Sequence, residues 1–308
     1  MNAQTQIHDT LIHARWLLTV ENDTILENHS VAVTDGVISA LLPTAEAGAL
    51  VAKETITLDN HVLMPGLINL HGHSAMTLLR GYADDKQLMD WLQNHIWPAE
   101  GKHVDDSFVY DGSLIGMAEM LRSGTTTIND MYFFHDAVAR AGVASGMRTF
   151  VGCSILEFPT NYAKNADEYI SRAMREREAY LDNPLVAFTL APHAPYTVAD
   201  ETFRKITQIV QEQDMLAHCH IHETMDEVNT SLKEHGKRPL ARLNDIGFLD
   251  TKLIAAHMVH LTDDEIALAA AKNISVAHNP TSNMKLASGI APIVKMMNAG
   301  INVGVGTD

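Results

Sequence analysis

The chain has 308 residues, of which 46% are hydrophobic, enough to bury a large core in one barrel or in two domains. Its 22 basic and 38 acidic residues give a net charge of −16, which argues against nucleic acid or an anionic membrane surface as a partner. The two cysteines, Cys153 and Cys219, argue against a disulfide framework. Met1–Asp9 lacks the basic and apolar regions of a secretory signal, and no apolar run is long enough for a membrane span, so we expect a cytoplasmic protein.

Residues 1–62 predict a small N-terminal β module. Short segments with alternating polar and apolar residues are typical of strands, and Asp35-Gly36 between two of them predicts a hairpin turn. The module has no paired histidines or acidic cluster, so we expect it to act as a scaffold. The expected strands are Thr10–Val20, Ser30–Thr34, Gly36–Leu42 and Thr55–Asn60.

Residues 63–308 alternate apolar strand-like runs with helical segments, which predicts an α/β fold of the (β/α)8 barrel type. Gly124 is expected to follow the end of one helix, and Thr262-Asp263-Asp264-Glu265 is a capping box that opens another. The expected strands are Leu63–His73, Thr125–Asp130, Arg148–Ser154, Val186–Ala191, Met215–His222, Leu253–His257, Ile274–His278 and Ile301–Gly306. Expected helices include Lys86–His95, Asp105–Ser123, Ala166–Leu181 and Thr224–His235.

The first barrel strand ends on two histidines, His71 and His73. On a strand, the spacing of two residues points both imidazoles to the same face. The chemistry of such barrels lies at the carboxyl ends of the strands, so polar residues at later strand ends should meet the two histidines around one mouth. Imidazoles and carboxylates are ligands that a divalent transition metal accepts. The later candidates are His193, His220, Glu223, His257, His278 and Asp308.

Several stretches resemble the amidohydrolase superfamily: Leu63-Met-Pro-Gly-Leu-Ile-Asn-Leu-His-Gly-His73, His220-Ile-His-Glu223, Ala255-Ala-His-Met-Val-His260 and Val305-Gly-Thr-Asp308. Two more, Leu190-Ala-Pro-His-Ala-Pro-Tyr196 and His278-Asn-Pro-Thr-Ser-Asn-Met-Lys-Leu-Ala-Ser-Gly-Ile-Ala-Pro292, resemble the 5′-methylthioadenosine/S-adenosylhomocysteine deaminases. The resemblance covers about residues 8 to 308. Members of that family continue past the Gly-Thr-Asp motif with a last barrel helix and with strands that complete an N-terminal β-sandwich. The barrel of residues 63–308 is therefore expected to be truncated after strand 8.

The resemblance implies one divalent metal per chain, with zinc as the default and iron or manganese as alternatives. Its ligands would be His71, His73, His220 and Asp308. Strand parity alone leaves His218, His220 and His222 equivalent, and the His-x-x-Glu spacing to Glu223 selects His220. We expect His218 and His222 to support the site or to pack. Strands 3 and 4 have no lysine that could bridge a second metal, so a mononuclear site is predicted.

The implied reaction is hydrolytic deamination of the adenine ring of 5′-methylthioadenosine, S-adenosylhomocysteine and adenosine by metal-activated hydroxide, giving the inosine analogue and ammonia. His257 and Asp308 would orient the attacking water and take its proton, and Glu223 would protonate the ring nitrogen. Glu100, in Trp-Pro-Ala-Glu, would accept hydrogen bonds from the ribose hydroxyls, and His193 would lie along the nucleoside. Glu223 and Asp308 would thus also contact the substrate.

Two alternatives stay open for the function. A deaminase or chlorohydrolase of the same branch would act on guanine, cytosine or a triazine, but Glu100 favours a nucleoside because a free base has no diol. A metal-binding regulatory barrel without catalysis is disfavoured by the complete set of ligands and proton carriers. Arg148 opens a strand, which is usually a structural position, with contact to a 5′ substituent as the alternative. The expected partner is a small purine nucleoside, with a homo-oligomer as a further option.

Overall fold

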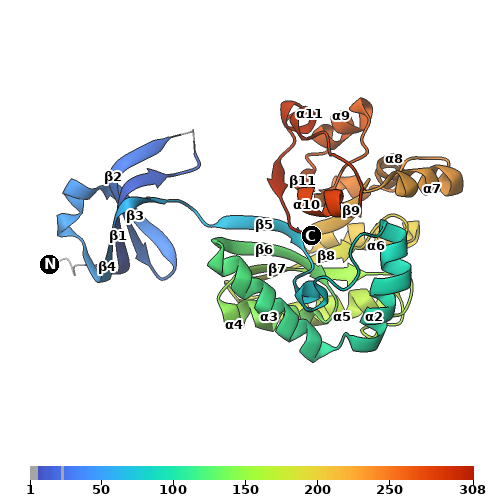
Figure 1. The fold of residues 1–308 in the computed structure, drawn as a ribbon, viewed down its shortest axis with the longest axis horizontal. Coiled ribbons are helices and arrows are strands. Elements are labelled where there is room, and N and C mark those ends of the chain that lie inside the picture. Colours follow the sequence, from blue (N-terminus) through green and yellow to red (C-terminus); the bar gives the residue numbers. More distant parts are fainter. Residues whose placement is uncertain (1–5, 22–23) are drawn as a thin grey trace. The chain divides into compact units, whose positions relative to one another are not determined.

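A computed structural model describes residues 6–21 and 24–308 and divides the chain into two compact units, Met1–Gly66 and Leu67–Asp308 (Figure 1). The segment Met1–Asp9, in which no secretory signal is expected, lies partly outside the described residues. Within the described ranges, none of the helices has the length and apolar character needed to cross a membrane.

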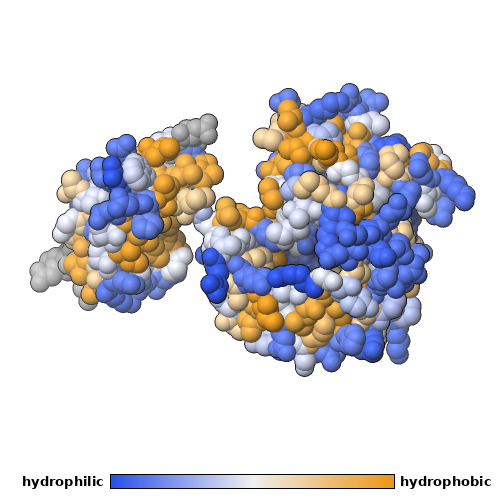
Figure 2. Space-filling view, viewed as in Figure 1, coloured by the Kyte–Doolittle hydropathy of each residue, from blue (hydrophilic) through white to orange (hydrophobic). Residues whose placement is uncertain are grey.

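The first unit contains a four-stranded sheet in the order β3-β2-β1-β4. Its central strand β1 pairs antiparallel with β2 and parallel with β4. Asp35 and Gly36 join β2 to β3 with φ values of 50° and 74°, so both turn residues are left-handed and the predicted hairpin is confirmed. Apolar side chains lie on the surface of this unit, among them Val37 and Ile38 (Figure 2). The strands are β1 (Ile7–Leu18), β2 (Ile25–Thr34), β3 (Val37–Pro43) and β4 (Val51–Leu63).

The second unit is a barrel of eight parallel strands, which confirms the predicted α/β barrel. The strands lie in chain order from β5 to β12. The two ends of this series meet where the backbone N–H groups of Thr307 and Asp308, just past β12, both donate to the His71 carbonyl of β5 at 2.9 Å. Closure of the barrel therefore brings Asp308 to His71. The strands are β5 (Leu67–Gly72), β6 (Thr125–Tyr132), β7 (Arg148–Ile155), β8 (Val186–Pro192), β9 (Leu216–Ile221), β10 (Lys252–His257), β11 (Ser275–His278) and β12 (Val303–Val305).

Helices follow the strands, and local sequence signals set several of their ends. Thr262 and Glu265 form the predicted capping box, and Gly124, with a φ of 89°, follows the helix that ends at Arg122. The helix expected at Lys86–His95 begins at Leu88, changes from α to π geometry at Leu92, and continues directly into α2 at Trp97. The α-helices are α1 (Leu88–Trp91), α2 (Trp97–His103), α3 (Asp106–Arg122), α4 (His135–Ser145), α5 (Ala166–Glu178), α6 (Asp200–Glu212), α7 (Met225–His235), α8 (Pro239–Asp245), α9 (Asp263–Ala271), α10 (Pro280–Lys285) and α11 (Ile293–Asn298). Shorter turns are η1 (Thr44–Ala49), η2 (Ser74–Leu79), η3 (Leu92–Ile96, π) and η4 (Phe248–Asp250).

One close approach fixes the segment that follows His73. The 3-10 turn η2 begins at Ser74 and packs on α3, where Gly112 has no side chain to keep the two backbones apart. A Cβ atom at Gly112 would lie 2.3 Å from the carbonyl oxygen of Ala75, well inside van der Waals contact. This glycine therefore lets α3 support the end of the first barrel strand.

Candidate metal centre

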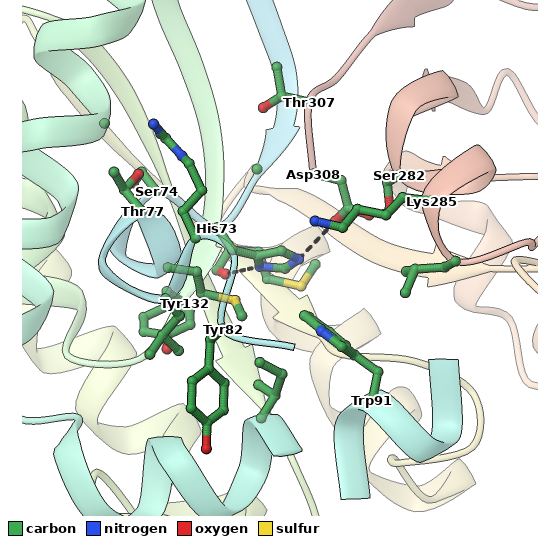
Figure 3. A pocket seen from close by; sticks show the side chains of 18 of the residues that line it. His73, Ser74, Thr77, Tyr82, Trp91, Tyr132, Ser282, Lys285, Thr307 and Asp308 are labelled. Carbon is green, nitrogen blue, oxygen red and sulfur yellow. Dashed lines mark hydrogen bonds and ion pairs between the residues drawn. The ribbon is translucent and has the colours of Figure 1, made fainter. Parts of the chain in front are cut away.

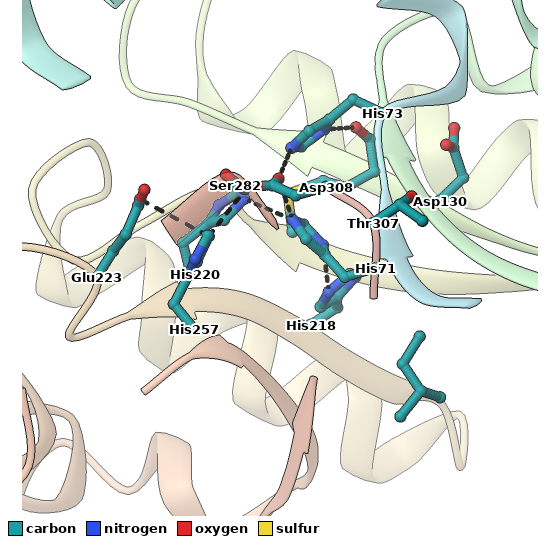
Figure 4. A network of polar contacts seen from close by, with 12 residues as sticks. His71, His73, Asp130, His218, His220, Glu223, His257, Ser282, Thr307 and Asp308 are labelled. Atoms are coloured by element: carbon teal, nitrogen blue, oxygen red, sulfur yellow. Dashed lines mark hydrogen bonds and ion pairs between the residues drawn. The ribbon is translucent and has the colours of Figure 1, made fainter. Parts of the chain in front are cut away.

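Four side chains at the carboxyl ends of three strands converge at one point of the barrel (Figure 4). His71 lies near the end of β5, His73 follows β5 directly, His220 lies near the end of β9, and Asp308 follows β12. Their ligand atoms all lie within 4.8 Å of one another. His71 Nε2 is 2.8 Å from Asp308 Oδ1 and 3.1 Å from His220 Nε2. The structure thus brings together the four residues that the sequence proposes as metal ligands.

The hydrogen bonds on the far side of each ring decide whether these imidazoles suit a metal. His73 Nδ1 donates to the Met131 carbonyl at 2.6 Å, and His220 Nδ1 donates to the His193 carbonyl at 2.7 Å. Because a carbonyl only accepts, both Nδ1 atoms carry a proton, and Nε2 is the nitrogen of each ring that faces the cluster and could bind a metal in its unprotonated form. His71 Nδ1 likewise has a partner behind it, since it lies 3.0 Å from His218 Nε2. Three oriented imidazoles and a carboxylate fit a divalent cation with nitrogen and oxygen ligands.

His257 and Glu223 lie beside this cluster and could carry protons. His257 Nε2 is 3.6 Å from Asp308 Oδ2 and 3.7 Å from Glu223 Oε2, so the ring lies between the two carboxylates. Its Nδ1 is held by Asn283 Oδ1 at 2.8 Å. Burial raises the pKa of Glu223, against the opposing effect of the His257 imidazole. Glu223 can therefore hold a proton at a pH where an exposed carboxyl would lose it.

A pocket of about 750 Å³ opens onto the cluster (Figure 3). His73, Glu100, His193 and Asp308 are among its lining residues. Glu223 does not line it and is only 4% exposed, so the predicted proton donor lies deeper than the pocket wall.

Two lining residues have pKa values displaced by burial. Burial raises the pKa of Glu100, against the effects of a hydrogen bond from Tyr132 and of the His73 charge. Burial and the neighbouring imidazoles lower the pKa of His193 to about 3, so its ring is neutral. His193 Nδ1 lies 3.0 Å from Thr197 Oγ1, and its carbonyl holds His220. His193 thus lines the pocket and also orients His220, one of the candidate metal ligands.

The structure places two residues that the sequence left open. His222 does not face the cluster: β9 ends at Ile221, His222 has a φ of 57°, and its Nε2 accepts from the Leu240 backbone at 3.1 Å. The parity argument was wrong here because the strand ends one residue too early. Arg148 is the exposed first residue of β7, at the opposite end from the barrel mouth, and does not line the pocket, so its contact with a 5′ substituent is not supported.

Sequence reasoning also missed supporting residues. Ser282 Oγ donates to Asp308 Oδ2 at 2.5 Å, and Asn283 holds His257. Both lie in the stretch His278–Pro292 that carries the resemblance, so a search of it for polar side chains could have found them. Tyr132, whose hydroxyl donates to Glu100 Oε1, is the last residue of β6 and lies outside the stretches that carry the resemblance, so it gave no comparable signal.

The fold and this set of ligands define a metal-dependent hydrolase of the barrel type. Residues 62–308 match the model of the amidohydrolase family, and the chain belongs to that family. It is 42% identical, over 97% of its length and 68% of the relative's, to the 5-methylthioadenosine/S-adenosylhomocysteine deaminase of Saccharophagus degradans. It is 45% identical, over 83% of its length and 61% of the relative's, to the 5′-deoxyadenosine deaminase of Methanocaldococcus jannaschii.

A solved structure is similar over almost the whole chain. The adenosine deaminase of Xanthomonas campestris, determined with bound zinc, superposes with a TM-score of 0.96 at 45% identity, over 99% of this chain and 70% of that one. Together these relatives confirm the family and the hydrolytic deaminase class predicted from the sequence.

Proposed function

We propose that the protein deaminates the adenine ring of 5′-methylthioadenosine, S-adenosylhomocysteine and adenosine, releasing ammonia and the inosine analogue. The observation that carries the proposal is the convergence of three oriented imidazoles and a carboxylate on a pocket that is also lined by the half-buried carboxylate of Glu100. The names of the relatives support an adenine nucleoside as the substrate. The bound zinc of the similar structure supports zinc as the metal, with iron or manganese as alternatives.

His71, His73, His220 and Asp308 would hold one divalent cation. When bound, such a cation supplies Lewis-acid activation of the water that attacks the ring. Asp308 and His257 orient that water and accept its proton, since His257 lies between Asp308 and Glu223. A second metal is not expected, because neither β7 nor β8 contains a lysine that could be carboxylated to bridge it.

Glu223 delivers a proton to the ring nitrogen beside the attacked carbon. Burial favours its protonated form, and positioned proton transfer of this kind contributes about 10²–10⁴-fold to a rate. Because Glu223 is only 4% exposed, the base must be the most deeply inserted part of the nucleoside. This orientation leaves the sugar at the pocket wall, where Glu100 lies.

Glu100 distinguishes the proposed substrates from the free bases of the alternative reading. Each charge-assisted hydrogen bond from a ribose hydroxyl contributes about 1.5–3 kcal/mol. Guanine, cytosine or a triazine has no diol and would leave the Glu100 carboxylate with the Tyr132 hydroxyl as its one hydrogen-bond donor among the described residues, which such a site penalises. The barrel is therefore proposed to be a nucleoside deaminase.

A panel of ammonia-release assays tests the proposal. We expect the zinc-loaded protein to release ammonia from 5′-methylthioadenosine, S-adenosylhomocysteine and adenosine at a higher kcat/KM than from guanine, cytosine or adenine. A preference for guanine or cytosine would favour the alternative deaminases. No turnover of any compound by protein with a full metal content would favour a non-catalytic barrel.

A further inference from the structure

We infer that Tyr132 is a positioning residue for substrate selection: its hydroxyl fixes the Glu100 carboxylate so that one oxygen is presented to the ribose diol. The inference rests on the proposed function, because it concerns how the nucleoside is distinguished from its 2′-deoxy analogue. Tyr132 is neither a candidate metal ligand nor a candidate proton carrier, so the proposed mechanism gives it no other role.

The geometry divides the two oxygens of Glu100 between protein and pocket. Tyr132, the last residue of β6, is 4% exposed and its Oη donates to Glu100 Oε1 at 2.7 Å. Glu100 Oε2 makes no hydrogen bond to any residue in the described ranges, yet it is not among the fully buried unpaired atoms. Both residues line the pocket, in which Figure 3 draws the side chain of Tyr132. Oε2 is therefore the oxygen left for a ligand.

The chemistry of the pair keeps this division in place. Burial and the neighbouring carboxylate raise the pKa of Tyr132 well above its ordinary value, so the phenol stays protonated and acts as a donor. Burial raises the pKa of Glu100, and the hydrogen bond from Tyr132 acts in the opposite direction. The hydrogen bond therefore favours the charged carboxylate, which is the better acceptor. Loss of the hydroxyl would free the carboxylate to rotate and would favour its protonated form. Both changes weaken the acceptance of hydrogen bonds from a diol.

The backbone of Glu100 is held by a second, independent contact. Asn161, in the segment between β7 and α5, directs its Nδ2 at the carbonyl oxygens of Gly101 (3.1 Å) and Val104 (2.9 Å), at the end of α2. The same atom lies 3.4 Å from the Glu100 carbonyl. Asn161 thus holds the main chain around Glu100, and Tyr132 holds the Glu100 carboxylate. Because both the backbone and the carboxylate of Glu100 are held, the position of Oε2 is fixed before the substrate binds, and this pre-organisation favours its hydrogen bond to the ribose diol.

The test compares adenosine with 2′-deoxyadenosine in Tyr132→Phe, which removes one oxygen and keeps the ring. We expect kcat/KM for adenosine to fall at least about tenfold, mostly through KM, while kcat/KM for 2′-deoxyadenosine changes less than about twofold. The matched control is Tyr162→Phe, because Tyr162 Oη also donates to a carboxylate, Glu176 at 2.8 Å, but does not line the pocket. The control should keep the wild-type ratio between the two substrates. In Glu100→Ala, adding Tyr132→Phe should change the ratio no further.

The outcomes separate this inference from the proposed function. A wild-type enzyme that prefers adenosine, with the same preference in Tyr132→Phe, would overturn the role of Tyr132 and leave the function intact. Equal losses for both substrates would also overturn it, since they indicate a structural role. A wild-type enzyme without any preference would remove the role of Glu100 itself. Should Tyr132→Phe not fold, Tyr132→His, which keeps an aromatic ring but removes the hydroxyl, must lower the ratio in the same direction.

Discussion

His71 Nδ1 lies 3.0 Å from His218 Nε2, on the side of the ring opposite its contact with Asp308. His218 is fully buried in β9, and burial holds its pKa well below the usual value, so the ring is neutral. Its other nitrogen, Nδ1, is 3.0 Å from the Asn129 amide of β6. A chain of polar groups from β6 through β9 thus fixes the rotation of a candidate ligand on β5.

Replacement of His218 should therefore weaken metal binding without touching a ligand. In His218→Ala we expect zinc affinity to fall about 10–100-fold, the usual cost of losing a group that orients a ligating histidine. Chelator competition measures it directly. His222→Gln is the control, because His222 is also buried next to β9 but forms hydrogen bonds with the backbone of Leu240 and His260. The zinc affinity of this variant should stay near that of the wild type. Unchanged affinity in the His218 variant would contradict the role.

Glu223→Gln separates proton transfer from metal binding. The amide keeps the shape of the side chain but cannot give up a proton, so kcat for 5′-methylthioadenosine should fall at least about 10²-fold. Zinc content and melting temperature should be unchanged. Glu234→Gln, an exposed change in helix α7, which begins two residues after Glu223, should behave as wild type. Near-normal turnover in Glu223→Gln would mean that another group carries the proton.

Gly112 and Gly101 should respond to alanine in opposite directions. Both lie in helices, where alanine is favoured over glycine by about 1 kcal/mol. At Gly112 the new Cβ would meet the Ala75 carbonyl, whereas at Gly101 nothing lies within 4 Å. Gly112→Ala should therefore lower the free energy of unfolding by about 1–3 kcal/mol, and Gly101→Ala should raise it slightly. Denaturant unfolding measures both free energies. A higher free energy of unfolding in both variants would contradict the close packing of η2 on α3.

His135 should contribute to the loss of stability in acid. Burial lowers its pKa to about 3, and its Nδ1 lies 3.2 Å from the Tyr162 hydroxyl. In the unfolded chain the pKa is about 6.5, so below that pH the unfolded state binds a proton that the folded state does not. Stability is therefore full above pH 6.5 and falls as the pH decreases toward 3. From pH 7 to 5 the loss from this residue is about 2 kcal/mol.

His135→Gln should remove that contribution, leaving the acid dependence of the other histidines. Urea unfolding at pH 7 and pH 5 measures the difference, and the variant should lose less stability than wild type between the two. The same loss in both proteins would show that His135 is not held neutral in the folded state.

Sequence and structure agree where the argument depends on one regular strand. The two-residue period of a strand and the rule that barrel sites lie at strand ends predicted that His71 and His73 meet later strand-end residues, and the family resemblance selected His220 and Asp308 among these. The parity argument fails at His222 because β9 ends at Ile221 and His222 itself is left-handed. No spacing could have shown that Tyr132 reaches Glu100, because the two lie 32 residues apart and only the tertiary fold brings their side chains together.

Zinc titration of the metal-free protein, with deamination of 5′-methylthioadenosine followed by the change in absorbance, tests the central claim most directly. One site of three imidazoles and one carboxylate predicts no activity without metal and a linear rise that ends at one equivalent of zinc per chain. Full activity in the metal-free protein, or a rise that continues to two equivalents, would contradict a single catalytic metal at this site.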